Sequence, residues 1–116
     1  MLASENRLKK RKDFGYIYKN GESVYSKNFV LMHTVNKFKK IRIGFSVSKK
    51  VGKAYIRNKI KRQLRAIFRE NISHVPPAKN YVIIAKPGVV DLTYAGMRDE
   101  ILYILAKALK GAGNAE

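Results

Sequence analysis

The residues best suited to chemistry are cations that recur along the segment 49–69. Four of them stand four residues apart, at Arg57, Lys61, Arg65 and Arg69. On a helix they would share one side, and like charges at this spacing repel by roughly a few tenths of a kcal/mol per pair unless an anion binds them. The planar guanidinium group suits bidentate contacts with phosphate. The pattern therefore favours a surface that binds a polyanion over an ordinary solvated helix face.

The same segment predicts an amphipathic helix over residues 55–71. Its apolar side chains fall within an arc of roughly 120°, and they are Ile56, Ile60, Leu64, Ile67 and Phe68. The opposite side carries cations and one amide, namely Asn58, Lys61, Arg62, Arg65 and Arg69. The preceding loop, 48–54, adds Lys49, Lys50 and Lys53, and Gly52 permits close backbone approach. This loop lacks the spacing of a Walker phosphate loop.

Residues that could catalyse a reaction are scarce. The two histidines, His33 and His74, lie far apart in the sequence, and a lone histidine in a strand is more often packed or exposed than catalytic. The basic segment holds no pair of carboxylates, which a metal-dependent nuclease needs to hold its ions. Cysteine is absent, which excludes thiolate metal sites and disulfides. We therefore expect neither catalytic residues nor a metal site in the protein itself.

Composition and charge narrow the possible partners. The chain has 116 residues, 46% of them hydrophobic, so we expect a single domain over 1–116 with its ordered core at about 7–109. The formal charge is +17, and between Glu22 and Glu70 fourteen lysines and arginines occur without an acid. Such a chain concentrates on polyanions. Because neither a signal peptide nor an apolar run of membrane-spanning length is present, we expect a cytoplasmic protein that binds no membrane.

The elements that must position these residues follow from periodicity and turn signals. Helices are expected at 10–19, 55–71 and from Asp91 or Thr93 to 109, and strands at 23–25, 28–35, 41–47 and 81–85. The polar stretch 36–40 reads as a hairpin between two of these strands. The order α-β-β-β-α-β-α predicts an α+β two-layer sandwich with a four-stranded sheet. Phe14 and Tyr18 lie one helical turn apart, where they could either fill the core or stack on bases.

The run 44–65, GFSVSKKVGKAYIRNKIKRQLR, resembles the signature of the protein subunit of bacterial ribonuclease P. The central part of this resemblance is Arg57-Asn58 followed by Lys61-Arg62 and Arg65. Residues 8–21 and the strand 81–85 also match the family pattern, so the similarity covers about residues 7–109. Met32 departs from the pattern, which often has tyrosine there, and Lys53 replaces a more usual asparagine.

The resemblance implies a fold, a pair of RNA partners and a division of labour. It implies a left-handed β-α-β crossover in the sheet. The segment 49–69 would contact the catalytic RNA subunit, in a 1:1 complex, through Lys49, Lys50, Lys53, Arg57, Asn58, Lys61, Arg62, Arg65 and Arg69. The basic residues Lys9, Lys10 and Arg11 would add to this charge. A cleft containing Phe14, Tyr18, Met32 and His33 would receive the 5′ leader of precursor tRNA. The RNA subunit would cleave the tRNA precursor using Mg²⁺ that it holds itself.

Three other functions fit parts of the sequence less well. A structural RNA-binding protein of the ribosome would share the charge and the fold class, but not the spacing of the signature. A DNA-binding regulator could use 55–71 as its recognition helix, but a short glycine turn and partner helix before it are absent. A protein-only nuclease would need the clustered carboxylates that the sequence lacks. We therefore expect RNA rather than DNA as the partner.

Overall fold

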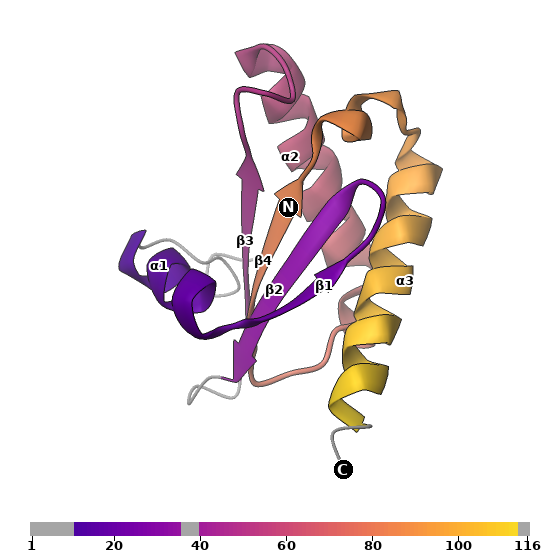
Figure 1. Ribbon diagram of the computed structural model, residues 1–116. Helices are drawn as coiled ribbons and strands as arrows, with labels where there is room; N and C mark the ends of the chain where they lie inside the picture. Colours follow the sequence, from indigo (N-terminus) through magenta and orange to yellow (C-terminus); the bar gives the residue numbers. More distant parts are fainter. Residues whose placement is uncertain (1–10, 36–39, 114–116) are drawn as a thin grey trace.

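The computed structural model describes residues 11–35 and 40–113, and side chains as far as residue 108 (Figure 1). Its helices are α1 (Arg11–Asn20), α2 (Ala54–Glu70) and α3 (Tyr94–Gly113), with short 3-10 helices η2 (Ile72–His74) and η3 (Pro87–Asp91). Its strands are β1 (Glu22–Tyr25), β2 (Phe29–Val35), β3 (Ile41–Val47) and β4 (Lys79–Ala85). The predicted order α-β-β-β-α-β-α is confirmed. None of the helices in the described part is long and apolar enough to cross a membrane.

The sheet has the strand order β1-β2-β4-β3. β2 is antiparallel to both β1 and β4, and β3 is parallel to β4. The expected hairpin across 36–40 is therefore wrong, because β4 lies between β2 and β3; residues 36–39 themselves lie outside the described part. The physical reason is visible in β4, where Val82 and Ile83 point to opposite faces and both are fully buried. A strand that is apolar on both faces is most stable in the middle of a sheet.

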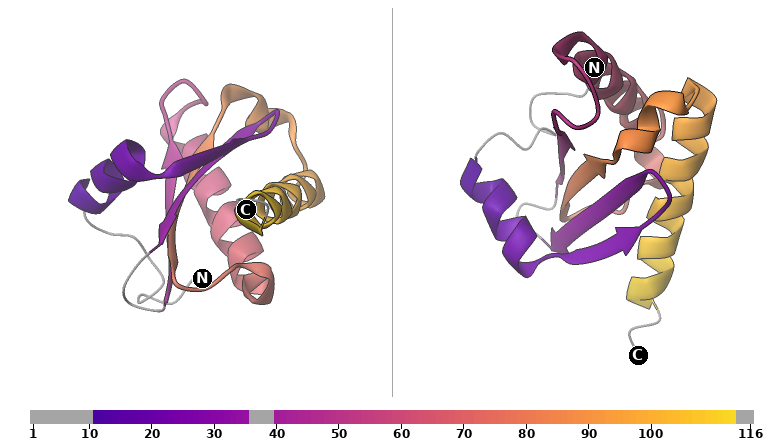
Figure 2. Two further views of the ribbon diagram at one scale, coloured as in Figure 1. Left: turned by 60° about the horizontal axis from the view of Figure 1, so that its bottom comes forward. Right: turned by 45° about the horizontal axis from the view of Figure 1, so that its top comes forward.

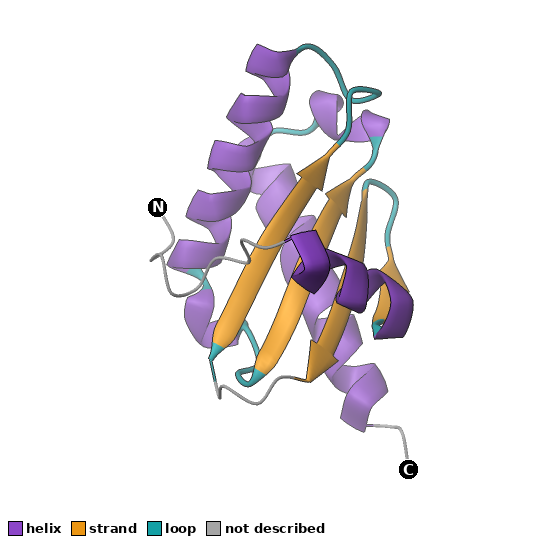
Figure 3. Ribbon diagram, turned by 90° about the vertical axis from the view of Figure 1, so that its left-hand side faces the viewer, coloured by secondary structure: helices purple, strands orange, loops and turns teal. Residues whose placement is uncertain are grey.

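The connection from β3 through α2 to β4 is left-handed, as the resemblance implied. In Figure 3, β3 and β4 point the same way, β4 lies to the right of β3, and α1 lies in front of the sheet. α2, drawn at the left of β3, packs on the opposite face, which is turned away from the viewer. A chain that moves to the right while its helix lies behind the sheet follows a left-handed path. Nearly all parallel connections have the opposite hand, so this crossover is a specific feature of the fold.

The helices cover the two faces of the sheet unequally (Figure 2). α2 and α3 pack on one face and form the expected sandwich with the sheet. The centre of this core contains Phe29, Leu31, Ile43, Leu64, Ile67, Phe68, Ile83, Met97, Ile101 and Ile104. The short helix α1 lies on the opposite face, where Ile17 and Val82 form a smaller buried cluster with Phe14, Met32 and Ile84 packed against it. Of the described helices, α1 alone packs on this second face.

Glycine is required where α1 ends. The amide of Gly21 donates to the carbonyl of Ile17 at 2.7 Å, which closes the last turn of the helix. A Cβ atom at position 21 would lie 2.5 Å from that same oxygen. The chain can therefore turn from α1 straight into β1 only because residue 21 has no side chain, and this turn holds α1 against the sheet.

Candidate nucleic-acid interface

The outer face of α2 forms a basic surface around a hollow of about 450 Å³. The hollow is lined by Asn58, Lys61, Arg62, Arg65, Ala66 and Arg69. Asn58, Arg62 and Arg69 are exposed, whereas Lys61 and Arg65 are half-buried. The predicted apolar stripe faces the other way, because Ile60, Leu64, Ile67 and Phe68 are all buried against the sheet. The amphipathic pattern of the sequence therefore sets both the core side and the basic side of α2.

The cations of this surface are electrostatically uncompensated. Within the described residues, no carboxylate lies within 4.0 Å of the charged groups of Lys61, Arg62, Arg65 or Arg69. The first turn of α2 contains no acid, although a helix N-terminus favours one. A helix face of like charges is destabilised by their repulsion. A bound polyanion would remove that repulsion, so phosphate groups are the ligands that this surface suits best.

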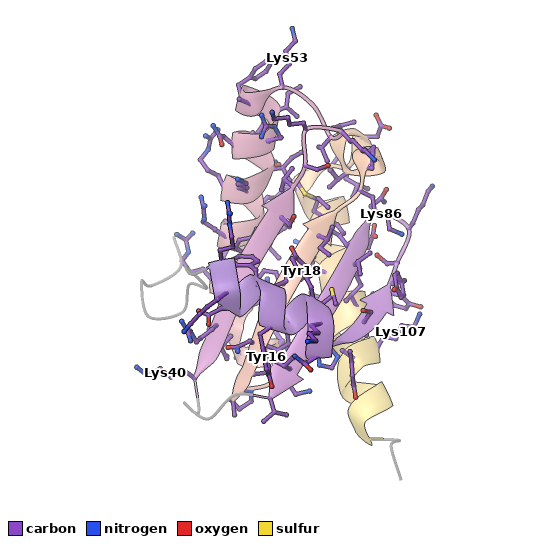
Figure 4. The ribbon with its side chains drawn as sticks, turned by 60° about the vertical axis from the view of Figure 1, so that its left-hand side comes forward. Tyr16, Tyr18, Lys40, Lys53, Lys86 and Lys107 are labelled. Carbon is purple, nitrogen blue, oxygen red and sulfur yellow. The ribbon has the colours of Figure 1, made fainter. Side chains whose placement is uncertain are left out.

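The loop before α2 extends the basic surface at its N-terminal end. Lys49, Lys50 and Lys53 are exposed, and Figure 4 shows Lys53 projecting from the end of the molecule. Arg57 behaves differently from the other signature cations. It is half-buried, and its Nε donates to the carbonyl of Gly52 at 3.1 Å. Arg57 therefore fixes the loop to the helix as well as adding charge.

A second surface lies on the other face of the sheet, around α1. The rings of Phe14 and Tyr18 stand 6.5 Å apart at 48°. Phe14 packs with Met32 against the small cluster, while Tyr18 remains 45% exposed. In Figure 4, Tyr18 and Tyr16 lie on opposite sides of α1, and Tyr18 lies on the side towards the end of the molecule where Lys53 projects. Three of the four residues expected in the leader cleft thus lie together.

His33 does not lie with Phe14, Tyr18 and Met32. Side chains alternate along β2, so that Met32 faces α1 whereas His33 faces the opposite side and is only 3% exposed. Its Nδ1 lies 3.4 Å from Nζ of Lys79, and its Nε2 lies 3.9 Å from a carboxylate oxygen of Glu22. Burial, and next the charge of Lys79, lower the pKa of His33 against an opposing effect of Glu22. The expectation that His33 lines the leader cleft is therefore wrong.

The structure also adds residues that the sequence did not assign to a site. Arg42 lies on the α1 face, with Nη2 3.7 Å from Oδ2 of Asp13. Because side chains alternate between the two faces along β3, the sequence already indicated that Arg42 faces away from the core. Lys59 is exposed on α2, beside the assigned cations. Arg11 is exposed at the start of α1, whereas Lys9 and Lys10 lie outside the described residues.

In residues 11–35 and 40–113, no group of three or more His, Cys, Asp or Glu side chains could hold a metal ion.

Comparison with known proteins identifies the family. The model of the family described as "Ribonuclease P" matches residues 2–109. The chain belongs to the Ribonuclease P family. The ribonuclease P protein component of a Geobacillus species is 42% identical over 108 residues, which cover 92% of this chain and 93% of the relative. The corresponding protein of Finegoldia magna is 42% identical over 102 residues, covering 88% of this chain and 89% of the relative.

Solved structures of this family share the fold. The RNase P protein of Staphylococcus aureus superposes with a TM-score of 0.83 at 40% identity, covering 89% of this chain and 94% of that one. The RNase P protein of Thermotoga maritima gives a TM-score of 0.82 at 33% identity, covering 87% of this chain and 96% of that one. The ribonuclease P family therefore accounts for the α+β architecture that the sequence predicted.

Proposed function

We propose that this protein is the protein subunit of ribonuclease P and takes part in removing 5′ leaders from precursor tRNA. Its membership of the Ribonuclease P family carries the proposal. The uncompensated basic face of α2 supports it, since the signature residues Arg62 and Arg65 lie on that face. In this proposal α2 and the loop 48–53 bind the catalytic RNA subunit, one protein to one RNA, in the cytoplasm, and neither DNA nor a membrane is a partner.

The protein contributes binding, and the RNA subunit carries the chemistry with Mg²⁺ that it holds. The sequence suggests no protein catalyst. A domain with a formal charge of +17 lowers the repulsion between the catalytic RNA and its tRNA substrate. Less Mg²⁺ is then needed to bring the two RNAs together. This effect explains how a protein without catalytic residues assists a nuclease.

The α1 face supplies the contact with the leader. A single-stranded RNA is commonly held by stacking of its bases on aromatic rings. Tyr18 offers an exposed ring beside Phe14, and Met32 adds a polarizable surface next to them. Mature tRNA has no leader and cannot make these contacts. The face around α1 would therefore separate substrate from product.

A reconstitution experiment tests the proposal. The purified protein is mixed with precursor tRNA at low Mg²⁺, with and without the catalytic RNA of a bacterial ribonuclease P. We expect cleavage at the 5′ end of the tRNA only when protein and RNA are both present. Cleavage by the protein alone would instead support a protein nuclease, and no stimulation of the RNA would exclude the proposed role.

A double variant tests the assignment of α2. Arg62→Ala with Arg65→Ala should weaken binding to the catalytic RNA roughly tenfold or more, and should lower the slope of log affinity against log salt by about 1 to 2. The matched control is Arg98→Ala with Lys107→Ala, which removes the same charge from α3. Equal affinities and slopes for the two double variants across a salt series would contradict the assignment.

A further inference from the structure

A groove separate from the arginine-lined hollow runs along the flank of α2. It has a volume of about 250 Å³ and is lined on one side by α2 and on the other by η3 and the residue that follows it. Tyr55, Lys59 and Gln63 form the α2 wall. These three residues are spaced four apart and therefore stand in one row along the helix. Val90 and Leu92 form the facing wall.

The walls of this groove expose apolar surface that the fold does not use. Tyr55 is 70% exposed and Val90 is 47% exposed, whereas Val89 at the base is almost fully buried. The groove thus has an aromatic ring on one side and an aliphatic surface on the other, and the exposed Lys59 follows Tyr55 one helical turn along the same wall. Flat aromatic and cationic groups together are what a nucleotide requires, for its base and its phosphate respectively.

We propose that the groove holds one unpaired nucleobase of the RNA bound to α2, stacked on Tyr55, with the adjoining phosphate at Lys59. This inference rests on the proposed function, because the RNA is the one that the basic face of α2 binds. It assigns a role to a tyrosine that the fold leaves exposed at the start of α2.

Continuity with the basic face favours RNA as the occupant. Lys59 lies one helical turn before Arg62, so a backbone that contacts Arg62 can reach Lys59 without leaving the helix. None of the described side chains that line the groove is acidic. The neighbouring acid is Asp91, which ends η3 next to Val90 and does not line the groove.

The size of the groove limits the occupant. Sites for drug-sized ligands usually measure about 300–1,000 Å³, and this groove is smaller. It suits a flat group such as a single base better than it suits a peptide helix. Any base can stack on tyrosine, so the contact would add affinity without reading sequence.

Binding of the full chain to a transcript of a bacterial ribonuclease P RNA tests the inference. Tyr55→Ala should weaken binding by about 5- to 150-fold, the range expected when one base loses its aromatic partner. The salt slope should stay unchanged, because no phosphate contact is lost. Tyr55→Phe should bind like the parent. The matched control is Tyr103→Ala, which removes a similarly exposed tyrosine (58%) from α3 and should have no effect.

Each outcome decides between stacking and another role. Equal binding by Tyr55→Ala and Tyr103→Ala would overturn the inference, and so would a loss in Tyr55→Phe, since that would point to the hydroxyl group. Photocrosslinking of RNA that contains 4-thiouridine should label the peptide around Tyr55, and labelling elsewhere alone would also overturn it. The proposed function fails separately, if the Arg62→Ala and Arg65→Ala double variant binds RNA like the parent.

Discussion

At the scale of single residues, the carboxylate of Glu100 links α3 to the turn between β1 and β2. It accepts hydrogen bonds from the hydroxyl of Ser26, from the backbone amide of Asn28 at 2.7 Å and from the side-chain amide of Asn28 at 2.9 Å. Burial raises the pKa of Glu100, but these hydrogen bonds and the charge of Lys86 outweigh burial and leave the pKa below its usual value. The ionised form of Glu100 therefore stabilises the fold.

Glu100→Gln should therefore destabilise the protein at neutral pH by about 1–3 kcal/mol, because an amide cannot accept all three hydrogen bonds. The depressed pKa means that this contribution is present above about pH 4.5, the ordinary pKa of glutamate, and is lost as pH falls through the lower folded-state value. Urea unfolding of the parent and of the Glu100→Gln variant at pH 7 and pH 3 measures this contribution to the free energy of unfolding. A difference between parent and variant that did not shrink at pH 3 would contradict the account.

The free energy of unfolding should also depend on pH through His33, because the fold favours its neutral form. Because burial and Lys79 lower the pKa of His33, the folded protein binds fewer protons than the unfolded chain just below pH 6.5. The free energy of unfolding should then decrease as pH falls from 6.5 towards the folded-state pKa. His33→Gln should remove this decrease, whereas the control His74→Gln, at an exposed position, should keep it. The measurement is urea unfolding between pH 5 and pH 7.5, and identical profiles for the two variants would refute the prediction.

At the scale of elements, α2 begins in a way that favours binding over stability. Its N-cap is Lys53, whose extended backbone suits a cap but whose side chain makes no capping hydrogen bond. Serine, threonine, aspartate and asparagine are the stabilising caps. A lysine here places another cation at the positive end of the helix. An anion bound at the N-terminus of α2 would account for a lysine at the cap position.

Lys53→Ser should accordingly raise the free energy of unfolding by about 1 kcal/mol, since serine can accept a hydrogen bond from the first turn. It should also weaken binding to the catalytic RNA and lower the salt slope by about 1, because one cation is lost. The control Lys53→Ala should show the weaker binding without the added stability. Thermal unfolding and RNA titrations measure the two effects, and equal stability of the serine and alanine variants would argue against a cap at this position.

The sequence predicted the bounds of single helices and strands better than it predicted which elements lie next to each other in the fold. β3 was bounded correctly at Ile41–Val47, and α2 within one residue at each end, because periodic burial marks such segments locally. The central position of β4 was missed, because strand order depends on contacts between residues far apart in the chain. The misplacement of His33 had a different cause. The alternation that separates His33 from Met32 is present in the sequence of β2, but the resemblance implies a cleft that contains both residues.

At the scale of the whole molecule, the sheet separates two surfaces. α1, with Phe14 and Tyr18, lies on one face, and α2, with its outward basic side, lies on the other (Figures 2 and 3). The same sheet supports both, since Val82 is buried under α1 and Ile83 under the opposite core. A protein built this way can hold two RNA segments at a fixed relative position. The two contacts should therefore be separable by mutation.

Tyr18→Ala tests this separation in the assembled ribonuclease P. It should lower the preference for precursor tRNA over mature tRNA by about 5- to 150-fold, because the proposed stacking contact with the leader would be lost. Assembly with the catalytic RNA should be unchanged, in contrast to the Arg62→Ala and Arg65→Ala double variant. Competition binding of precursor and mature tRNA to the holoenzyme measures the preference, and titration of protein into RNA measures assembly.

Tyr16→Ala is the matched control, since Tyr16 is exposed on the other side of the same helix (Figure 4). A variant that combines Tyr18→Ala with the two arginine substitutions should show both losses, each at the size seen alone, because the sheet lies between the two surfaces and free energies of independent sites add within about 0.5 kcal/mol. If Tyr18→Ala impaired assembly as much as the arginine substitutions, or Tyr16→Ala impaired leader preference equally, the two faces would not act as separate RNA contacts.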